Sequence, residues 1–319
     1  MEKVYEGGVP LAEVVRSGFV ESVHRGSVVV LDGDGEVAIA VGDVHGPIQP
    51  RSANKPLQCV GMVRAGLRLT DPADLALVCG SHSGEDAHVS RVRALLRSAG
   101  LDESALRCPP DLPLGEPARH AVLAAGGGRA RIFMNCSGKH AGMLLTCTAA
   151  GWPLEEYYHP DHPLQERLAL TFEDLTGAPS AAVAVDGCGA PAFATSLTAL
   201  AGAYLRLVGA EPGAVERTVV DAMRAHPMMV AGTGADDTRL MEGVPGLMCK
   251  GGAEGVLAAA LPGVGAVVVK IDDGAQRARV PVLVSALRKL GVTAAVLDEL
   301  AEPPVFGGGA VVGAIRSLW

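Results

Sequence analysis

Strand-like runs near both ends of the chain, separated by a long helical stretch, constrain the fold more than any other feature. Residues 27–31 and 36–41 are apolar, and the Asp-Gly-Asp-Gly sequence between them predicts a hairpin. Two further strands are expected over 255–261 and 266–271, followed by a helix over 276–290. We therefore predict an α+β fold, with an antiparallel sheet built from N- and C-terminal segments and a helical middle.

The residues between these strands predict mostly helices. Such helices are expected over 52–63, 71–78, 88–99, 163–175, 192–207 and 213–225, with a loop that becomes a helix over 135–149. Residues 106–128 are rich in Pro and Gly and predict an irregular segment. No repeat or low-complexity linker interrupts the chain, so we expect a single domain over 1–319, with a helical subdomain at about 70–225.

The composition excludes two classes of protein. Hydrophobic residues make up 49% of the chain, which is too many for a disordered protein. The net charge is −8 and only 3% of the residues are aromatic, so the chain lacks the basic surface and stacking side chains of a nucleic-acid binder. The 41 glycines gather in several loops, where a backbone can approach a small ligand closely.

Neither membrane insertion nor export is indicated. The longest apolar stretch, 256–269, is interrupted by Pro262 and is shorter than the ~20 residues that a spanning helix needs. The first residues lack the basic and apolar regions of a signal peptide, so we expect a cytoplasmic protein. The seven cysteines are odd in number and irregularly spaced, which predicts buried free thiols rather than a disulfide framework.

Three short motifs carry hydroxyl and amine groups. Ser52-x-x-Lys55 would place both side chains on one helix face, where a lysine could take the proton of a serine. The loop 80–85 (Gly-Ser-His-Ser-Gly-Glu) offers further hydroxyls, and 250–255 (Lys-Gly-Gly-Ala-Glu-Gly) places a lysine before a strand. Taken singly, these motifs also fit a helix cap, a turn and a bulge. Their order matches the signature S-x-x-K, S-D-N and K-T-G of serine β-lactamases and penicillin-binding proteins.

Two further loops carry cysteine. Residues 135–140 (Asn-Cys-Ser-Gly-Lys-His) and 186–191 (Asp-Gly-Cys-Gly-Ala-Pro) each place a thiol among glycines. The separation of Cys136 and Cys188 is too long for a zinc ribbon, so spacing does not predict a metal. From the residues alone, two buried thiols in tight turns are the favoured explanation of these loops.

The motifs together resemble the third structural class of L-asparaginases, the rhizobial type. They run in family order over nearly the whole chain: 51–55, 81–85, 135–140, 186–191, His226-Pro227 with 232–234, and 250–255. The resemblance implies a fold like that of serine β-lactamases and a homodimer. It also implies hydrolysis of L-asparagine to L-aspartate and ammonia.

The resemblance assigns two Ser–Lys pairs to this chain. Ser52 pairs with Lys55, and Ser81 pairs with Lys250. We expect Ser52 to be the nucleophile, although Ser81 is an alternative. The third motif reads Lys-Gly-Gly where Lys-Thr-Gly is usual, so one hydroxyl that could touch the substrate is lost.

A zinc ion is implied by the same resemblance. Its ligands would be Cys136, Lys139 and Cys188. Two thiolates and a neutral amine leave a fourth position for water or substrate, as an open zinc site requires. Whether zinc takes part in catalysis or only organises the loops is left open.

The remaining residues of the predicted site bind the substrate. By resemblance, Arg51 and Asp186 would hold the α-carboxylate and α-amino groups of the amino acid, and His140 is a further candidate contact. Asp236 and Asp237, which follow the Gly-Thr-Gly loop, receive no role.

Two other functions fit parts of this pattern. One is a β-lactamase-like esterase or peptidase, which the missing signal peptide disfavours if the substrate lies in the cell wall. The other is a catalytically silent homologue that binds an amino acid or zinc. The intact set Ser52, Lys55, Ser81 and Lys250 argues against it. We therefore expect an L-asparaginase that acts on a small molecule and binds neither nucleic acid nor membrane.

Overall fold

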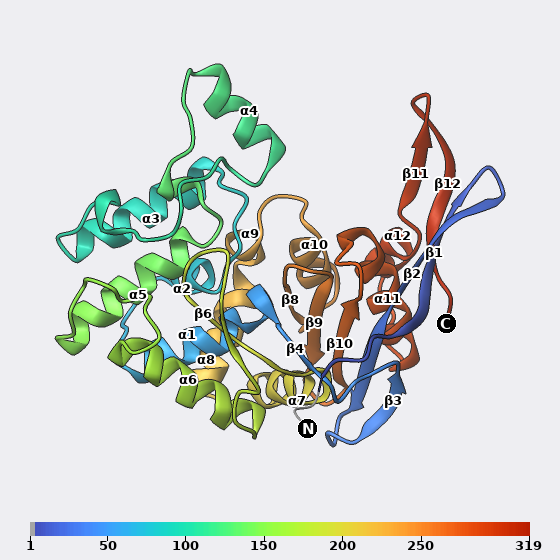
Figure 1. Ribbon diagram of the computed structural model, residues 1–319, viewed down its shortest axis with the longest axis horizontal. Helices are drawn as coiled ribbons and strands as arrows, with labels where there is room; N and C mark the ends of the chain where they lie inside the picture. The colour runs from blue at the N-terminus through green and yellow to red at the C-terminus, as the bar shows by residue number, and fades with distance from the viewer. Residues whose placement is uncertain (1–3) are drawn as a thin grey trace. The chain divides into compact units, whose positions relative to one another are not determined.

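The computed structural model describes residues 4–319, and its chain forms two compact units (Figure 1). The sheet unit runs to Ala53 and also contains Ala194–Gly209 and Arg239–Trp319. The helical unit contains Asn54–Phe193 and Ala210–Thr238. The single domain with a helical part at about 70–225 stays a prediction.

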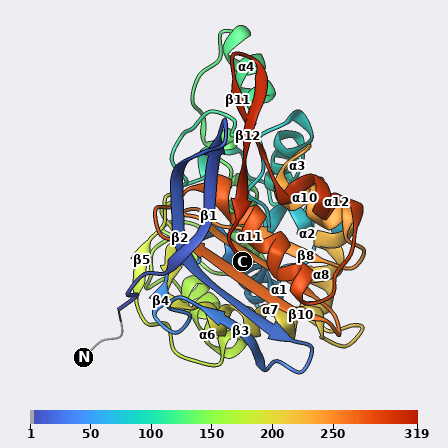
Figure 2. The ribbon, with the colours of Figure 1, turned by 90° about the vertical axis from the view of Figure 1, so that its right-hand side faces the viewer.

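One antiparallel sheet dominates the sheet unit. Seven strands follow the order β11-β12-β1-β2-β10-β9-β8, and β3 also pairs with β2. Their bounds are β1 (Val9–Arg16), β2 (Phe19–Asp32), β3 (Val37–Val41), β8 (Met248–Gly251), β9 (Val256–Leu261), β10 (Gly265–Ile271), β11 (Pro304–Gly307) and β12 (Ala310–Ser317). Figure 2 shows β1 and β2 running beside β12, so segments from opposite ends of the chain share one sheet. The predicted α+β class and the origin of the sheet are confirmed.

The centre of this sheet is covered on both faces. Four successive residues of β10, Ala266–Val269, have no exposed surface, although their side chains point alternately to opposite faces. Helix α7 (Leu197–Val208) packs on β9 and β10, and α11 (Gln276–Lys289) packs on β10 and β12. Helix α12 (Ala295–Ala301) lies against α11, and β4 (Pro47–Ile48) pairs with β7 (Thr195–Ser196) at the margin of the unit. Strands that are buried on both sides explain the run of Val and Ala in β9 and β10.

The helical unit packs its helices around a central one. Helix α2 (Pro72–Val78) contacts α1, α3, α5, α8 and α9, and Leu77 and Val78 within it have no exposed surface. The other helices are α1 (Lys55–Arg64), α3 (Asp86–Ser98), α4 (Glu116–Ala124), α5 (Ser137–Ala150), α6 (Pro163–Thr176), α8 (Val215–Ala225) and α9 (Pro227–Val230). A hairpin of β5 (Val183–Val185) and β6 (Pro191–Phe193) also belongs to this unit. The last residues of the helical unit, up to Thr238, form the start of helix α10 (Asp236–Gly243).

Several predicted elements differ from those observed. Residues 106–128 contain the nine-residue helix α4, because Pro117 lies in its first turn, where proline is tolerated, and the other Pro and Gly residues of the segment lie outside it. The helix expected over 192–207 begins only at Leu197, since β6 and β7 take up the preceding residues. Lys250 precedes β9 as expected, but it also lies within β8, a strand that was not predicted. No helix within residues 4–319 is both long and apolar enough to cross a membrane.

Candidate active site

A buried lysine amine touches a serine hydroxyl in the helical unit. Lys55 opens α1 and is only 1% exposed. Its Nζ donates to Ser81 Oγ over 3.0 Å and to the carbonyl oxygen of Gly80. Ser81 itself is partly exposed. The arrangement therefore combines a desolvated amine with a hydroxyl that a small molecule can reach.

The loop after α2 holds Ser81 in place. The Ser81 N–H donates to Val230 O over 2.8 Å, and the His82 N–H donates to Asn135 O over 3.1 Å. A Cβ on Gly80 would lie 2.8 Å from Met229 O, so this position accepts only glycine without a shift of the backbone. Both N–H groups are thus used within the helical unit, and they do not serve as oxyanion donors.

Two thiols and a second lysine amine converge beside this pair. Cys136, Lys139 and Cys188 are each at most 3% exposed. Lys139 Nζ donates to Cys188 Sγ over 3.2 Å, and the two thiol groups are hydrogen-bonded to each other. Cys136 and Lys139 lie at the start of α5, whereas Cys188 lies in the tight β5–β6 turn.

The pKa values of the two thiols in this cluster shift in opposite directions. A hydrogen bond from Cys136 and the charge of Lys139 hold the pKa of Cys188 well below its usual range. The same hydrogen bond, together with burial, raises the pKa of Cys136. Burial opposes a charge on Lys139, but the neighbouring Cys188 and Cys136 outweigh it and raise the pKa of that amine. The surroundings therefore favour ionisation of Cys188 over that of Cys136.

The donor set of this cluster fits a soft divalent cation. Thiolate sulfur and a neutral amine nitrogen are ligands that zinc accepts, and the three groups converge from two elements. Lys139, whose pKa is raised without a metal, would release its proton on binding zinc. No group of three or more His, Cys, Asp or Glu that could hold a metal occurs in the described part of the chain. The cluster reaches three donors only because Lys139 contributes its amine.

His140 follows this cluster and is fixed by a tyrosine. The Arg107 N–H donates to Tyr157 Oη over 3.0 Å, and Tyr157 Oη lies 2.7 Å from His140 Nδ1. The tyrosine oxygen can accept from both Arg107 and an imidazole N–H, and its hydrogen bond with Nδ1 joins Tyr157 to a neutral His140. Burial lowers the pKa of His140, which favours this neutral form. His140 has no exposed surface, and its predicted contact with substrate stays a prediction.

Asp186 occupies the turn that carries Cys188. Its Oδ1 accepts from the Gly187 N–H over 2.8 Å, and Cys188 Sγ lies 3.6 Å from Oδ2. The Gly189 N–H donates to Asp186 O, and Gly189 has a φ of +89°, which glycine adopts readily. Asp186 is partly exposed, whereas the adjoining Cys188 is buried, so Asp186 lies where solvent reaches the cluster.

Three predicted residues lie together in the sheet unit. Arg51 and Ser52 form a 3₁₀ turn over Arg51–Asn54, and Arg51 has a φ of +52°, a strained value for this residue. A Cβ on Gly252 would lie 2.3 Å from Pro50 O, so the end of β8 packs directly on this turn. Lys250, which is 1% exposed, donates to Gly251 O over 2.7 Å. The structure thus gathers Arg51, Ser52 and Lys250 in one unit, and Lys55 with Ser81 in the other.

Glu85 lies in one of the sequence motifs but received no predicted role, and the structure gives it a structural one. Its carboxylate accepts from Ser83 Oγ over 2.6 Å and from the N–H and hydroxyl of Thr233, each over 2.8 Å. Although partial burial opposes ionisation, these hydrogen bonds lower the pKa of Glu85. They join the Gly-Thr-Gly loop to the serine loop. Asp236 and Asp237 begin α10, and the structure gives them no catalytic role.

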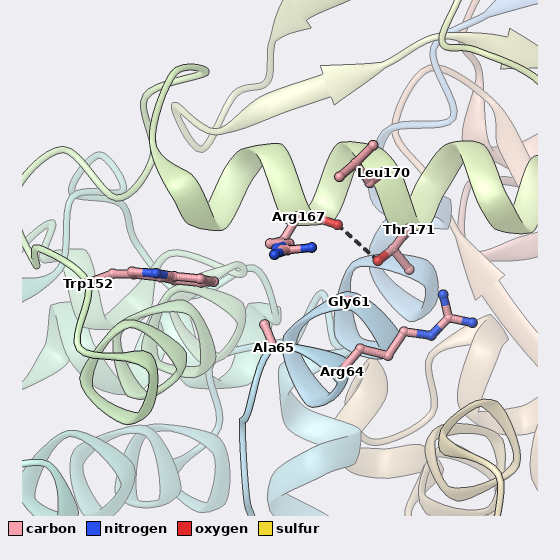
Figure 3. A pocket seen from close by; sticks show the side chains of 7 residues that line it. All are labelled: Gly61, Arg64, Ala65, Trp152, Arg167, Leu170 and Thr171. Atoms are coloured by element: carbon pink, nitrogen blue, oxygen red, sulfur yellow. Dashed lines mark hydrogen bonds between the residues drawn. The ribbon is translucent and has the colours of Figure 1, made fainter.

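A separate cavity lies elsewhere in the helical unit. It measures about 490 Å³ and is lined by Arg64, Trp152 and Arg167 among others (Figure 3). Arg64 pairs with Asp174 and Glu216, so carboxylates compensate its charge. None of the predicted site residues lines this cavity, and we assign it no part in the predicted chemistry.

Comparison with known proteins places the chain in a family. Residues 12–317 match the L-asparaginase II family. The chain belongs to this family. The resemblance to L-asparaginases and the expectation of an asparaginase-type enzyme are thereby confirmed. A comparison with curated proteins finds no match.

Solved structures give weaker similarities. A putative β-lactamase from Bacteroides dorei DSM 17855 is 16% identical with a TM-score of 0.44, over 84% of this chain and 93% of that one. A β-lactamase (Mb2281c) from Mycobacterium bovis is 18% identical with a TM-score of 0.43, over 84% and 95%. Mglu in its native form is 16% identical with a TM-score of 0.43, over 83% of this chain. This chain spans 63% of the length of Mglu.

Proposed function

We propose that this chain hydrolyses L-asparagine to L-aspartate and ammonia by acyl transfer through a lysine-activated serine. Membership in the L-asparaginase II family supports the substrate and the reaction. The contact of 3.0 Å between Lys55 Nζ and Ser81 Oγ is the observation that carries the mechanism. A lysine amine can accept a serine proton only in its neutral form, and burial favours that form.

The reaction has two halves. The serine oxygen attacks the side-chain amide carbon of asparagine while the lysine amine takes the serine proton. The C–N bond then breaks, and the departing nitrogen receives that proton and leaves as ammonia. Water, deprotonated by the same lysine, attacks the β-aspartyl ester; the bond between the acyl carbon and the serine oxygen breaks, the lysine returns the proton to the serine oxygen, and aspartate is released. Ser52 stays the predicted nucleophile from its motif, and Ser81 is the alternative that contacts Lys55. Backbone N–H groups near Ser52 and Lys250 are the proposed oxyanion donors.

The substrate's charged ends require partners of opposite charge. Arg51 is proposed to bind the α-carboxylate and Asp186 the α-amino group. A zinc ion, if bound, would be held by Cys136, Lys139 and Cys188, which fit it by donor type. When bound it would supply a Lewis acid beside the substrate.

Ammonia release tests the proposal directly. We expect wild-type protein to release ammonia from asparagine, and Lys55→Met to lose roughly 10²–10⁴-fold in turnover. Of Ser52→Ala and Ser81→Ala, the variant that removes the nucleophile should lose at least as much as Lys55→Met. Ser90→Ala, an exposed serine of α3, is the matched control and should keep wild-type turnover. Folded Lys55→Met with undiminished turnover would exclude the mechanism, and hydrolysis of nitrocefin without ammonia release would favour the β-lactamase-like alternative.

We further propose a cytoplasmic homodimer. Both properties rest on the sequence. Light scattering coupled to gel filtration should give twice the chain mass of 32.6 kDa. A monomer over the range of concentrations in which ammonia is released would contradict the homodimer.

A further inference from the structure

A fully buried histidine links the serine loop to the cysteine–lysine cluster. His82 follows Ser81 directly and has no exposed surface. Its Nε2 lies 2.9 Å from Ser137 Oγ, and Ser137 is the first residue of α5, directly after Cys136. The histidine therefore spans the two loops that carry the serine and the thiols of the candidate site.

The protons of this contact can be assigned by counting. Ser137 Oγ also lies 2.9 Å from Ile132 O, which can only accept. The single hydroxyl proton of Ser137 therefore goes to Ile132, and the proton between Ser137 and His82 comes from His82 Nε2. The Nδ1 atom of His82 is buried and has no hydrogen-bond partner within residues 4–319. A bare lone pair there costs less than an unpaired N–H or a buried imidazolium.

A second histidine supports the ring of the first. His88 lies parallel to His82, with ring centroids 5.2 Å apart and an angle of 12° between the planes. His88 Nε2 donates to Met228 O over 2.8 Å, because a carbonyl can only accept. Burial is the main cause that lowers the pKa of both imidazoles, so two neutral rings stack without repulsion.

We propose that His82, as the neutral Nε2–H tautomer, is a positioning residue for the acyl-transfer reaction. Its ring fixes the loop of Ser81 to the start of α5, while the backbone N–H of His82 donates to Asn135 O. The hydroxyl of Ser81 is thereby held 3.0 Å from Lys55 Nζ and at a set position beside the cysteine–lysine cluster. The positioning role of His82 rests on the proposed function, whereas the assignment of its tautomer does not.

Nitrogen-15 spectroscopy of the histidine side chains tests the tautomer without any substrate. The full-length protein carries nine histidines, and the signals that vanish in His82→Gln are those of His82. We expect a protonated Nε2 and an unprotonated Nδ1. A protonated Nδ1, or an imidazolium at neutral pH, overturns the assignment.

Kinetics of two amide variants tests the positioning role. A Gln side chain places its N–H near the position of His Nε2, whereas Asn reaches only to that of Nδ1. His82→Gln should therefore keep kcat within about threefold of wild type, while His82→Asn loses roughly 10–100-fold in kcat with an unchanged KM. Ser137→Ala should match His82→Asn, and the double variant should lose no more than either single variant.

These outcomes separate positioning from mere stability. If His82 only stabilised the fold, kcat per folded molecule would be the same in His82→Asn and wild type, and the proposal would be wrong. Equal losses in His82→Gln and His82→Asn would also overturn it. If the wild-type protein released no ammonia from asparagine, the proposed function would fail. The nitrogen-15 spectra alone would then decide whether His82 donates to Ser137.

Discussion

The hydroxyl of Tyr157 offers the most quantitative prediction. Tyr157 has no exposed surface, and its oxygen accepts from Arg107 N and is hydrogen-bonded to His140 Nδ1. The substitution Tyr157→Phe removes this oxygen and leaves the volume of the ring almost unchanged. Its effect therefore reports the two hydrogen bonds rather than packing.

The expected loss follows from the groups left unpaired. Each buried polar group without a partner costs about 1–3 kcal/mol, and two groups are orphaned. The Arg107 amide is only partly buried, so the lower part of the range applies to it. We expect Tyr157→Phe to lower the free energy of unfolding by about 2–4 kcal/mol.

Urea unfolding at equilibrium measures this difference, with Tyr158→Phe as the matched control. Tyr158 is the adjacent residue, and its hydroxyl makes no hydrogen bond within the described residues. The control should stay within about 0.5 kcal/mol of wild type. Equal slopes of free energy against urea are required for the comparison. A Tyr157→Phe midpoint indistinguishable from that of Tyr158→Phe would refute the hydrogen-bond assignment.

Three other predictions concern the metal, a glycine and a carboxylate. Elemental analysis should find zinc in the wild-type protein and less than a tenth of it in Cys136→Ser and Cys188→Ser; equal zinc in all three would reject these ligands. Gly138→Ala should destabilise the protein by about 1–3 kcal/mol in urea unfolding, because its Cβ would lie 2.8 Å from Leu77 O, whereas Gly202→Ala, with open space around it, should gain up to about 1 kcal/mol. Glu85 has a lowered pKa, so its contribution is complete above its unfolded pKa and is lost as pH falls through its folded pKa. The difference in unfolding free energy between wild type and Glu85→Gln should therefore shrink as pH falls below about 4; a constant difference would contradict this account.

Much of the fold was predictable because its signals are local. The hairpin over residues 27–41 carries its own turn sequence, and Asp71 caps α2 through the N–H of Ala73, as its position before a Pro suggests. Strands β1, β11 and β12 escaped prediction. Their residues alternate weakly between exposed and buried, and only their long-range pairing makes them strands.

The candidate site was predictable only where a motif carried it. Ser81 and Lys55 were both named from the sequence, but the contact between them depends on how α1 packs near the end of α2. The predicted pairing of Ser52 with Lys55 and of Ser81 with Lys250 stays a prediction. Tyr157 and Ser137 were missed, because a buried hydroxyl that orients a histidine has no sequence pattern of its own.

The central claim is that asparagine passes through a serine-bound β-aspartyl ester. Partitioning with hydroxylamine tests it most directly, because an acyl-enzyme can be captured by water or by hydroxylamine. The ratio of aspartate to β-aspartyl hydroxamate should be the same whether the acyl donor is asparagine or a β-aspartyl methyl ester, since both donors give one intermediate. A ratio that changes with the donor, or ammonia release with no hydroxamate at any hydroxylamine concentration, would contradict the acyl-enzyme.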